Sequence, residues 1–533
     1  MNEKDSVETI CQEMFGELAQ NFPVSCASDE FYYFPQIKHP EPDWSVWDRF
    51  SPGTVSEFAH RLSLWEGRFD RLLLSEKDPE TLAEISLYKK AARTLREQLS
   101  DVRTWQRQPT FYLTLVCIGL AEALEDEDPG AKHERAGTVA EYLDEVSHNM
   151  TDVPLLFLDM GQEMVSDTRN YLVLLSQELT ELKPAFDALD RFNERLLAVS
   201  TREDFLLPRE LLELIFRFHL ACDMGIDEVE YTLDEEIRET EATLEREAGS
   251  LSYGIGLDHK VRWKWPDVLE SIPIPALGKN GIVGFYREEV ARLAAHCLKE
   301  GWISEEFVAS CPVRVAPTPP SLSAIRAASS YSIPPKHPPT GGVFYVINTN
   351  VSDAAYRENY REYRMLCAHE TYPGHHLLDA SRWSMENPFL RTVEQPLFYE
   401  GWACFSEKIM KLTGYYTDPA DSLLLAKRRL WHAVRGKVDI GLQTGTMDVL
   451  AAAEYLTKSG ISAKRAGDAA RRYPLNPGYQ QCYTIGERRF RNLYEKYGGN
   501  DLQRFVKTIL SGGEIALADL EKKLKGKTAD GGT

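Results

Sequence analysis

The sequence lacks the paired cysteines of a disulfide scaffold. Its 533 residues include nine cysteines, an odd number, and these are scattered without a single C-x-x-C pair. This pattern is typical of reduced, mostly buried thiols rather than of a disulfide framework.

Basic charge is also scarce. Lysine and arginine number 61 against 82 acidic residues, which gives a formal net charge of −21. A chain this acidic repels phosphate backbones and anionic membrane surfaces, so neither nucleic acid nor a membrane is expected as a partner. The charge suits cationic or neutral small substrates, although an ordinary solubilising surface explains it as well.

Long apolar runs are absent. The longest, "FYLTLVCIGLAEAL" from Phe111, is too short to span a bilayer and predicts a buried helix. The first residues, "MNEKDSVETICQEMFGELAQNF", show no basic segment followed by an apolar one, so no secretory signal is visible. Together with the unpaired cysteines, these features predict a cytoplasmic protein.

Helical periodicity dominates the chain. Apolar residues recur at three- and four-residue spacing through residues 52–250 and again towards the C-terminus, whereas residues 271–350 are rich in proline and carry short β-prone runs. The sequence therefore predicts a mainly α fold, a large multi-helix body with a small inserted sheet. We expect an N-terminal helical region (1–270), a β-containing insertion (271–350) and a C-terminal helical catalytic region (351–533).

One short stretch, "HETYPGHH" at residues 369–376, holds three of the twelve histidines. The usual zinc motif H-E-x-x-H works because residues four apart lie about 40° apart around a helix. Here His375 would lie about 120° away from His369, and His376 about 10.5 Å along the axis, in a regular helix. Pro373-Gly374 permits a bulge that returns a histidine to His369, but the spacing does not choose between His375 and His376.

A zinc site needs a third protein ligand and an open position for water. Glu400, in "FYEGWACFSEKIMKLTG", lies on a predicted helix and is our candidate. Gly401 beside it predicts close approach by another backbone, which we expect to be the histidine helix. Glu407 lies on the same helix face as Glu400 and could hold a ligating imidazole. The competing interpretation is a solvated helix end whose histidines bind no metal.

At these motifs the chain resembles the bacterial domain-of-unknown-function 885 family, whose members are similar to gluzincin metallopeptidases. The resemblance spans nearly the whole chain and is carried by "HETYPGHH", "EGWACFSE", "GGVFYVINT", "RRLWHAVRGKVDIGL" and "PGYQQCYTIG". It implies a helical body with a central cleft that is lined by the edge strand of a short sheet. Because Gly-His closes the first gluzincin motif, the resemblance favours His375 as the second ligand. The chain departs from the family pattern at Gln443 and Tyr479, which leaves the expected metal ligands intact.

We hypothesise a zinc-dependent hydrolase of short peptides or related amides, a zinc metallopeptidase. Zinc on His369, His375 and Glu400 would activate water and polarise the scissile carbonyl. Glu370 would accept the proton of the water and deliver it to the leaving amine. The resemblance points to Tyr483 as the donor to the oxyanion, with Tyr479 as second choice.

Three further features complete the hypothesis. Arg488 and its neighbour Arg489 could bind a substrate carboxylate, which favours a carboxypeptidase, although a solvated helix face explains them equally well. The strand in "GGVFYVINTN" could receive a peptide by β-augmentation. His376, if it is not a ligand, would help to position the site or would cap the bulge, whereas His432 is expected to be a packed or surface residue.

Two other functions fit the same residues. One keeps the metal but hydrolyses a non-peptide amide or ester. The other is a non-catalytic helical scaffold that binds a peptide or partner protein, and Glu370 argues against it because a protein that only binds needs no base there.

Overall fold

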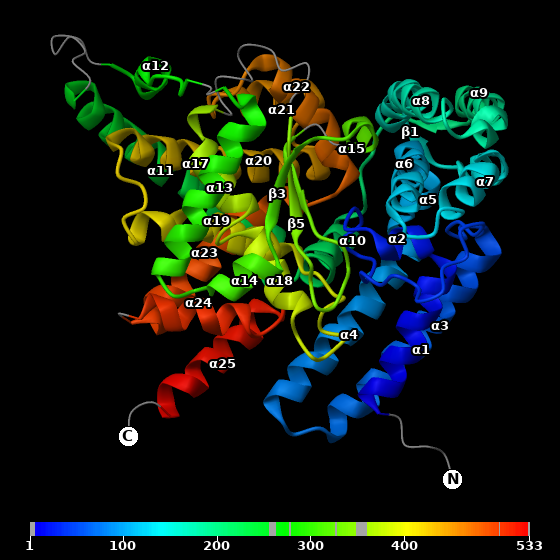
Figure 1. The fold of residues 1–533 in the computed structure, drawn as a ribbon, viewed down its shortest axis with the longest axis horizontal. Coiled ribbons are helices and arrows are strands. Elements are labelled where there is room, and N and C mark those ends of the chain that lie inside the picture. Colours follow the sequence, from blue (N-terminus) through cyan, green and yellow to red (C-terminus); the bar gives the residue numbers. More distant parts are fainter. Residues whose placement is uncertain are drawn as a thin grey trace. The chain divides into compact units, whose positions relative to one another are not determined.

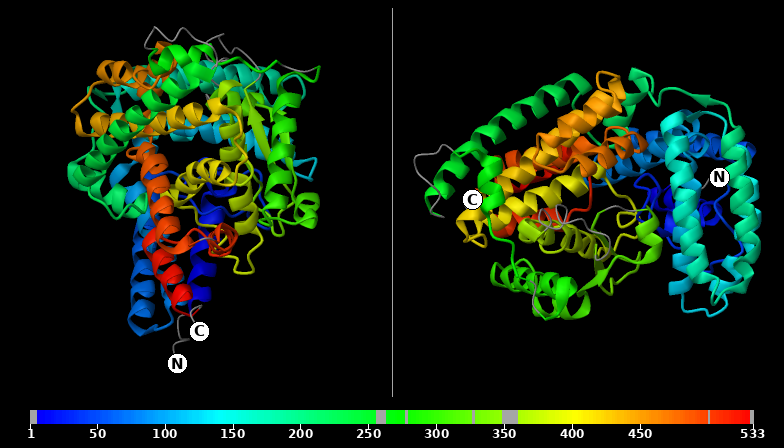
Figure 2. Two further views of the ribbon diagram at one scale, coloured as in Figure 1. Left: turned by 90° about the vertical axis from the view of Figure 1, so that its left-hand side faces the viewer. Right: turned by 90° about the horizontal axis from the view of Figure 1, so that it is seen from above.

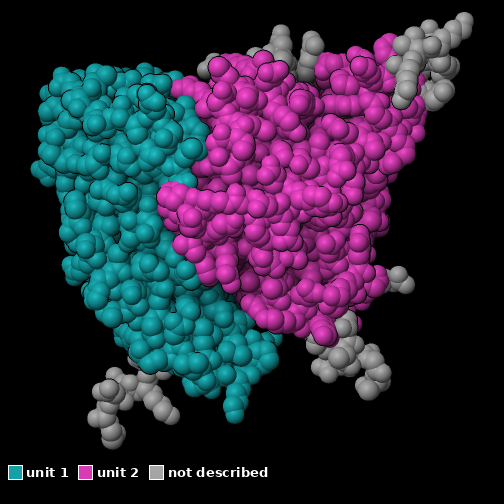
Figure 3. Space-filling view, turned by 180° about the vertical axis from the view of Figure 1, so that it is seen from behind, with its two compact units in different colours: residues 1–207, 318–328, 387–394 teal, residues 208–317, 329–386, 395–533 magenta. Residues whose placement is uncertain are grey.

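The protein is described by a computed structural model that covers residues 6–254, 263–276, 279–325, 328–347, 360–499 and 501–530. Contacts divide the chain into two units, which Figure 3 colours separately. Unit 1 contains residues 1–207, 318–328 and 387–394, and unit 2 contains residues 208–317, 329–386 and 395–533. These units do not coincide with the three segments expected from composition, whose boundaries stay a prediction.

Unit 1 is helical. Its elements are α1 (Val7–Asn21), α2 (Pro23–Ala27), α3 (Pro52–Ser75), α4 (Pro79–Glu97), η1 (Gln98–Val102), α5 (Thr104–Arg107), α6 (Pro109–Glu125), α7 (Ala131–Val146), η2 (Ser147–Asn149), β1 (Val153–Pro154), α8 (Leu155–Leu175), η3 (Thr180–Leu182), α9 (Lys183–Ala198), β2 (Thr201–Arg202) and α15 (Pro320–Ile325). Helix α6 contains the longest apolar run and is buried along most of its length, as predicted. None of the helices in the described parts of the chain combines the length and apolar character needed to cross a bilayer.

Unit 2 begins with helices and a small sheet. These elements are α10 (Arg209–Leu214), η4 (Ile215–His219), α11 (Ile226–Gly254), α12 (Trp265–Ser271), α13 (Gly281–Lys299), α14 (Glu305–Ser310), β3 (Val313–Pro317), β4 (Ser330–Ser332) and β5 (Gly342–Val346). The strand order is β3-β5-β4, with β5 parallel to β3 and antiparallel to β4. Helix α13 packs against β3 (Figure 1). The small inserted sheet is thus confirmed.

The position of β5 corrects one expectation. The strand of "GGVFYVINTN" was expected at an edge, but β5 is the central strand and its backbone is paired on both sides. An added peptide strand therefore cannot pair with β5, and β-augmentation at this strand is wrong. The end of that stretch, residues 348–350, lies outside the described residues.

The remaining helices of unit 2 carry the histidine and glutamate motifs. They are α17 (Tyr363–Glu370), α18 (His375–Trp383), α19 (Pro396–Leu412), α20 (Pro419–Thr444), α21 (Val449–Thr457), α22 (Ala463–Arg472), η5 (Tyr473–Leu475), η6 (Tyr479–Gln481), α23 (Cys482–Leu493), η7 (Tyr494–Gly498), α24 (Leu502–Leu510) and α25 (Leu517–Asp530). Helix α20 packs along α11, and α19 packs against both α23 and α17 (Figure 2). The mainly α fold is confirmed, with helices packed on helices around their apolar faces.

Close packing of α19 against α23 depends on two glycines. A Cβ at Gly401 would lie 2.5 Å from the Cα of Gly486, so the two backbones touch where the helices cross. We expected Gly401 to meet the histidine helix, and this is wrong, because the close partner is α23. The contact nevertheless fixes Glu400, the preceding residue, relative to Tyr483 on α23.

Candidate metal centre

The histidine motif folds as two helices rather than one bulged helix. Helix α17 ends at Glu370 and α18 begins at His375, so the expected bulge is in fact a complete break. Pro373 cannot donate a backbone hydrogen bond, which ends the helical pattern, and its carbonyl accepts a bond of 2.9 Å from Nε1 of Trp402 on α19. The break therefore has a fixed position against α19.

Gly374 allows the two helices to meet. Its N–H donates to the carbonyl of Ala368 over 3.0 Å. A Cβ at position 374 would lie 1.9 Å from the carbonyl oxygen of His369, so no side chain fits there. With glycine present, the rings of His369 and His375 lie 4.7 Å apart between centroids.

Three buried ligand atoms converge on one point. Oε2 of Glu400 lies 3.5 Å from Nε2 of His369 and 3.5 Å from Nε2 of His375. Two tetrahedral ligands at about 2.0–2.2 Å from one zinc ion are about 3.3–3.6 Å apart, so these separations fit zinc. Oε2 of Glu400 is buried and has no hydrogen-bond partner among the described residues, as a ligand atom should be.

The other oxygen of Glu400 is held by two tyrosines. Oε1 accepts hydrogen bonds from the hydroxyls of Tyr479, at 2.9 Å, and Tyr483, at 2.6 Å. Burial opposes ionisation of Glu400, but its close contacts with the imidazoles of His369 and His375 outweigh burial and hold the pKa of that carboxyl well below its usual range. In this structure both tyrosines orient the carboxylate, and the oxyanion role expected for Tyr483 stays a prediction.

His369 is oriented by the predicted glutamate. Its Nδ1 lies 3.0 Å from Oε1 of Glu407. Arg428, on α20, donates to the two oxygens of Glu407 from Nε at 2.7 Å and from Nη2 at 2.6 Å. Burial of Glu407 is outweighed by the charge of Arg428, which lowers the pKa of that carboxyl to about 2. An ionised Glu407 places the proton of His369 on Nδ1 and leaves Nε2 free to bind a metal.

His375 is oriented by stacking. Its ring lies 4.0 Å from the ring of Tyr399, centroid to centroid, at an interplanar angle of 18°. The hydroxyl of Tyr399 donates to Oδ2 of Asp379 over 3.1 Å, which ties this ring to α18.

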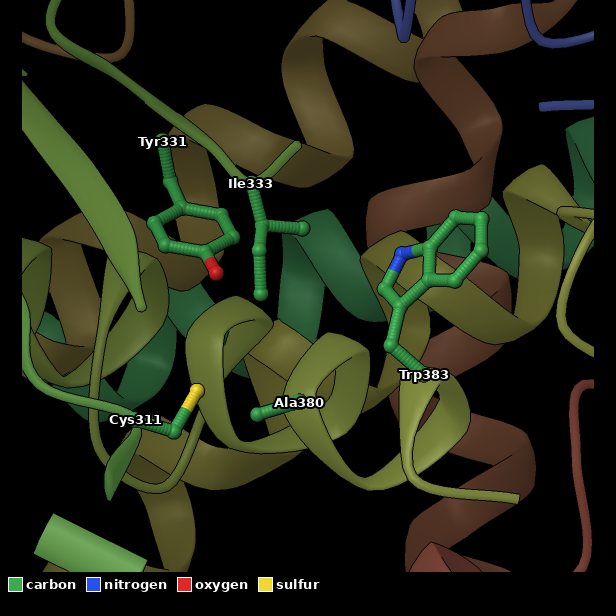
Figure 4. Close-up of a cluster of buried hydrophobic side chains, with 5 residues drawn as sticks. All are labelled: Cys311, Tyr331, Ile333, Ala380 and Trp383. Atoms are coloured by element: carbon green, nitrogen blue, oxygen red, sulfur yellow. The ribbon is translucent and has the colours of Figure 1, made fainter. Parts of the chain in front are cut away.

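His376 is turned away from this group. Its Nδ1 lies 2.9 Å from the hydroxyl of Tyr331, and its Nε2 lies 3.0 Å from the carbonyl oxygen of Cys311. Burial lowers the pKa of His376 to about 3, so the ring is neutral and uses both nitrogens in these bonds. Both of these partners, Tyr331 and Cys311, belong to the buried cluster of Figure 4, together with Ile333, Ala380 and Trp383. The spacing left His375 and His376 open, and the structure brings His375 to His369.

Glu370 completes the group as the last residue of α17. It is 8% exposed, and its carboxylate has no hydrogen-bond or ion-pair partner among the described residues. Burial raises the pKa of Glu370, while the charges of His369 and His375 oppose that rise. A carboxylate without a partner beside a candidate metal site is free to accept a proton.

Arg488 lies in a different cluster. Its guanidinium is 3.4 Å from Glu235 and 3.8 Å from Glu236, both on α11. Residues five apart on a helix point about 140° apart, so Arg488 faces away from the side of α23 that carries Tyr483. The structure therefore gives no support for its expected contact with a substrate carboxylate.

Helix α20 supplies neighbours that the sequence reasoning missed. Nδ1 of His432 lies 3.2 Å from Sγ of Cys404, and its ring is 6.3 Å from that of His369. A second possible ligand group, His369, Cys404 and Glu407, has its ligand atoms within 4.8 Å. This group suits zinc less well for two reasons. The carboxylate of Glu407 already accepts hydrogen bonds from Arg428. Burial raises the pKa of the Cys404 thiol to about 12, which disfavours the thiolate that binds zinc.

A sequence signal for these residues exists. Polar side chains recur at three- and four-residue spacing along the largely buried helix α20, at Arg428, His432, Arg435, Asp439 and Gln443. A polar stripe inside a buried helix requires partners, and this stripe could have pointed to the site.

Two solved structures share the fold of the whole chain. One, from Shewanella oneidensis, is described as a "putative lipoprotein of unknown function"; it aligns with a TM-score of 0.77 at 16% identity over 98% of this chain and 100% of its own. The other, a "putative lipoprotein" from Colwellia psychrerythraea, aligns with a TM-score of 0.75 at 16% identity over 98% of each chain. A carboxypeptidase of family M32 from Deinococcus radiodurans R1 reaches a TM-score of only 0.40 at 11% identity over 99% of each chain, which is too low to support an argument.

The predicted cytoplasmic location is contradicted by this comparison. The proteins from Shewanella and Colwellia, which share the fold of this chain, are both described as a "putative lipoprotein", a description that indicates the cell envelope for those two proteins. The prediction rested on the scattered cysteines, on the first residues of the chain and on the shortness of its apolar runs. None of these three features identifies the compartment of a protein.

The sequence comparisons identify the family. No curated protein matches the chain. The profile of the family described as "Bacterial protein of unknown function (DUF885)" matches residues 75–524, most of the sequence and all of the motifs that form the candidate metal centre. The chain belongs to this bacterial family, DUF885.

Proposed function

We propose that this chain is a zinc-dependent hydrolase of short peptides or related amides. The observation that carries the proposal is the convergence of Nε2 of His369, Nε2 of His375 and Oε2 of Glu400, with the unpaired carboxylate of Glu370 beside them. Two imidazoles and one carboxylate form a ligand set of catalytic zinc, which keeps one position open.

The chain's own groups divide the chemistry among them. When bound, zinc supplies a Lewis acid that polarises a carbonyl and makes water more acidic. Glu370, in its ionised form, accepts a proton from the attacking water and passes it to the leaving amine. Glu407 keeps the proton of His369 on Nδ1, and Tyr399 holds the plane of His375.

The two tyrosines have a further part in the proposal. Tyr479 and Tyr483 both donate to Oε1 of Glu400, and one donor is enough to orient that carboxylate. The other hydroxyl can then turn to the oxyanion that forms when water attacks the substrate.

A peptide screen tests the proposed function. The zinc-loaded protein is incubated with a library of short peptides, and cleavage is followed by mass spectrometry. We expect cleavage that stops when a chelator removes the metal and returns when zinc is restored. If the zinc-loaded protein cleaves no peptide, peptide hydrolysis is wrong, and non-peptide amides and esters become the substrates to screen.

A further inference from the structure

Arg435 is a cation beside the candidate metal centre. Its guanidinium lies over the ring of Tyr483, 3.9 Å from the centroid, and within 5.8 Å of the ring of Tyr473. Its Nε donates to Oε1 of Gln480 over 2.7 Å, and Nη2 donates to the same oxygen. The side chain thus has aromatic faces and one neutral acceptor around it.

Arg435 lacks the counter-ion that its neighbours have. Helix α20 carries five lysines and arginines, and the other four form ion pairs with acidic residues, namely Lys427 with Glu362, Arg428 with Glu407, Arg429 with Glu236 and Lys437 with Glu230 and Asp234. Among the described residues Arg435 forms no ion pair. A partly buried cation that packs on aromatic rings without an anion is unfavourable, so the site favours an anionic ligand.

The nearest acid on the helix does not fill this role. Asp439 lies one turn after Arg435, and its Oδ2 accepts the N–H of Gln480 over 3.0 Å. Burial raises the pKa of Asp439 to about 7, so at neutral pH its charge is incomplete. Gln480 thus bridges the two side chains without neutralising Arg435.

The ring of Tyr483 connects Arg435 with the candidate metal ligand Glu400. One face of Tyr483 carries the guanidinium, and the hydroxyl of the same ring donates to Glu400. Arg435 is therefore separated from a metal ligand by a single aromatic ring, and its side chain is only half-buried. The planar fork of a guanidinium matches a carboxylate with two parallel hydrogen bonds.

We propose that Arg435 binds a carboxylate of the substrate and thereby makes the hydrolase selective for peptides that carry one close to the cleaved bond. This inference rests on the proposed function and assigns the substrate class of that same site. It replaces Arg488, whose guanidinium is bound to Glu235 and Glu236.

The test uses three versions of one cleaved peptide with the zinc-loaded protein. The first has a free C-terminal carboxylate, the second a C-terminal amide, and the third an amide with an aspartate beside the cleaved bond. We expect kcat/KM for the free acid to exceed that for the plain amide by about 10- to 100-fold. If kcat/KM for the third peptide is as high as for the free acid, Arg435 recognises the carboxylate of a side chain. If it is as low as for the plain amide, Arg435 recognises only the C-terminal carboxylate.

Variants connect this preference to Arg435. Arg435→Gln is expected to bring kcat/KM for the free acid down to that for the plain amide, chiefly through KM, and Arg435→Lys to retain part of the preference, because lysine keeps the charge without the fork. Arg488→Gln is the matched control and should keep the full preference. Calorimetry of the free-acid peptide with the non-cleaving Glu370→Gln protein should show the same loss of affinity when Arg435→Gln is added.

The outcomes separate the two proposals. Equal cleavage of the acid and the plain amide by wild type overturns the role of Arg435 and leaves the hydrolase intact. A preference that survives Arg435→Gln and Arg435→Lys, or is lost in Arg488→Gln, also overturns it. If no peptide is cleaved, the proposed function fails and this inference fails with it.

Discussion

Replacement of Glu370 by glutamine is expected to lower kcat on a cleaved peptide by about 10²- to 10⁴-fold and to leave zinc bound. Glutamine has nearly the same shape but cannot accept the proton of water. Glu370 has no hydrogen-bond or ion-pair partner among the described residues, so the change breaks neither kind of bond. Steady-state kinetics beside metal analysis measures both effects on the same protein.

Glu386→Gln is the matched control for this prediction. Glu386 is an exposed glutamate of the same unit, outside the site, and its replacement should leave kcat unchanged. Turnover by Glu370→Gln within a few-fold of wild type would show that another group is the base. A non-catalytic scaffold predicts that Glu370→Gln binds its partner as wild type does.

Replacement of Gly374 by alanine is expected to damage both stability and the metal centre. The added Cβ would lie 1.9 Å from the carbonyl oxygen of His369 and 2.4 Å from that of Ala368, so backbone must move. We expect the free energy of unfolding to fall by at least about 2 kcal/mol. Zinc affinity should fall at least about tenfold, because α18 carries His375 away from His369.

Urea unfolding and zinc titration check this second prediction. Gly467→Ala is the control, because a Cβ at Gly467, in the interior of α22, meets nothing within 4 Å. That variant should keep the zinc affinity of wild type and be as stable as wild type or more stable by up to about 1 kcal/mol, because alanine favours a helix interior over glycine. Wild-type stability and zinc affinity in Gly374→Ala would contradict the close approach of the two helices.

Much of the fold follows from sequence periodicity. Apolar spacing predicted the helices on both sides of a proline-rich region, and the short sheet lies within that region, because these signals are local. The order β3-β5-β4 was not predictable, because strand order depends on contacts between residues far apart in the chain. For this reason β5 was expected at an edge although it is central.

The sequence predicted which residues form the candidate site better than it predicted how they are arranged. His369, Glu370 and Glu400 follow from residue type and spacing, and the structure brings them together with His375. The helix break at Pro373-Gly374 was expected only as a bulge, because spacing does not reveal that Trp402 anchors the carbonyl of Pro373.

Long-range partners explain the remaining differences. Arg488 was indistinguishable from a substrate ligand until its partners Glu235 and Glu236, about 250 residues earlier, were placed. His432 was set aside because a single histidine on a helix is more often packed. Its proximity to Cys404 and His369 depends on the packing of helices, which one sequence does not specify.

The most direct test of the account is the zinc content per folded chain, measured by plasma mass spectrometry after zinc loading and dialysis. We expect about one zinc in wild type and its loss in His369→Ala, His375→Ala and Glu400→Ala. His376→Ala should keep the metal, because His376 bonds to Tyr331 and Cys311 instead. A well-folded wild type that stays metal-free, or a His376→Ala protein that loses zinc while His375→Ala keeps it, would contradict the account.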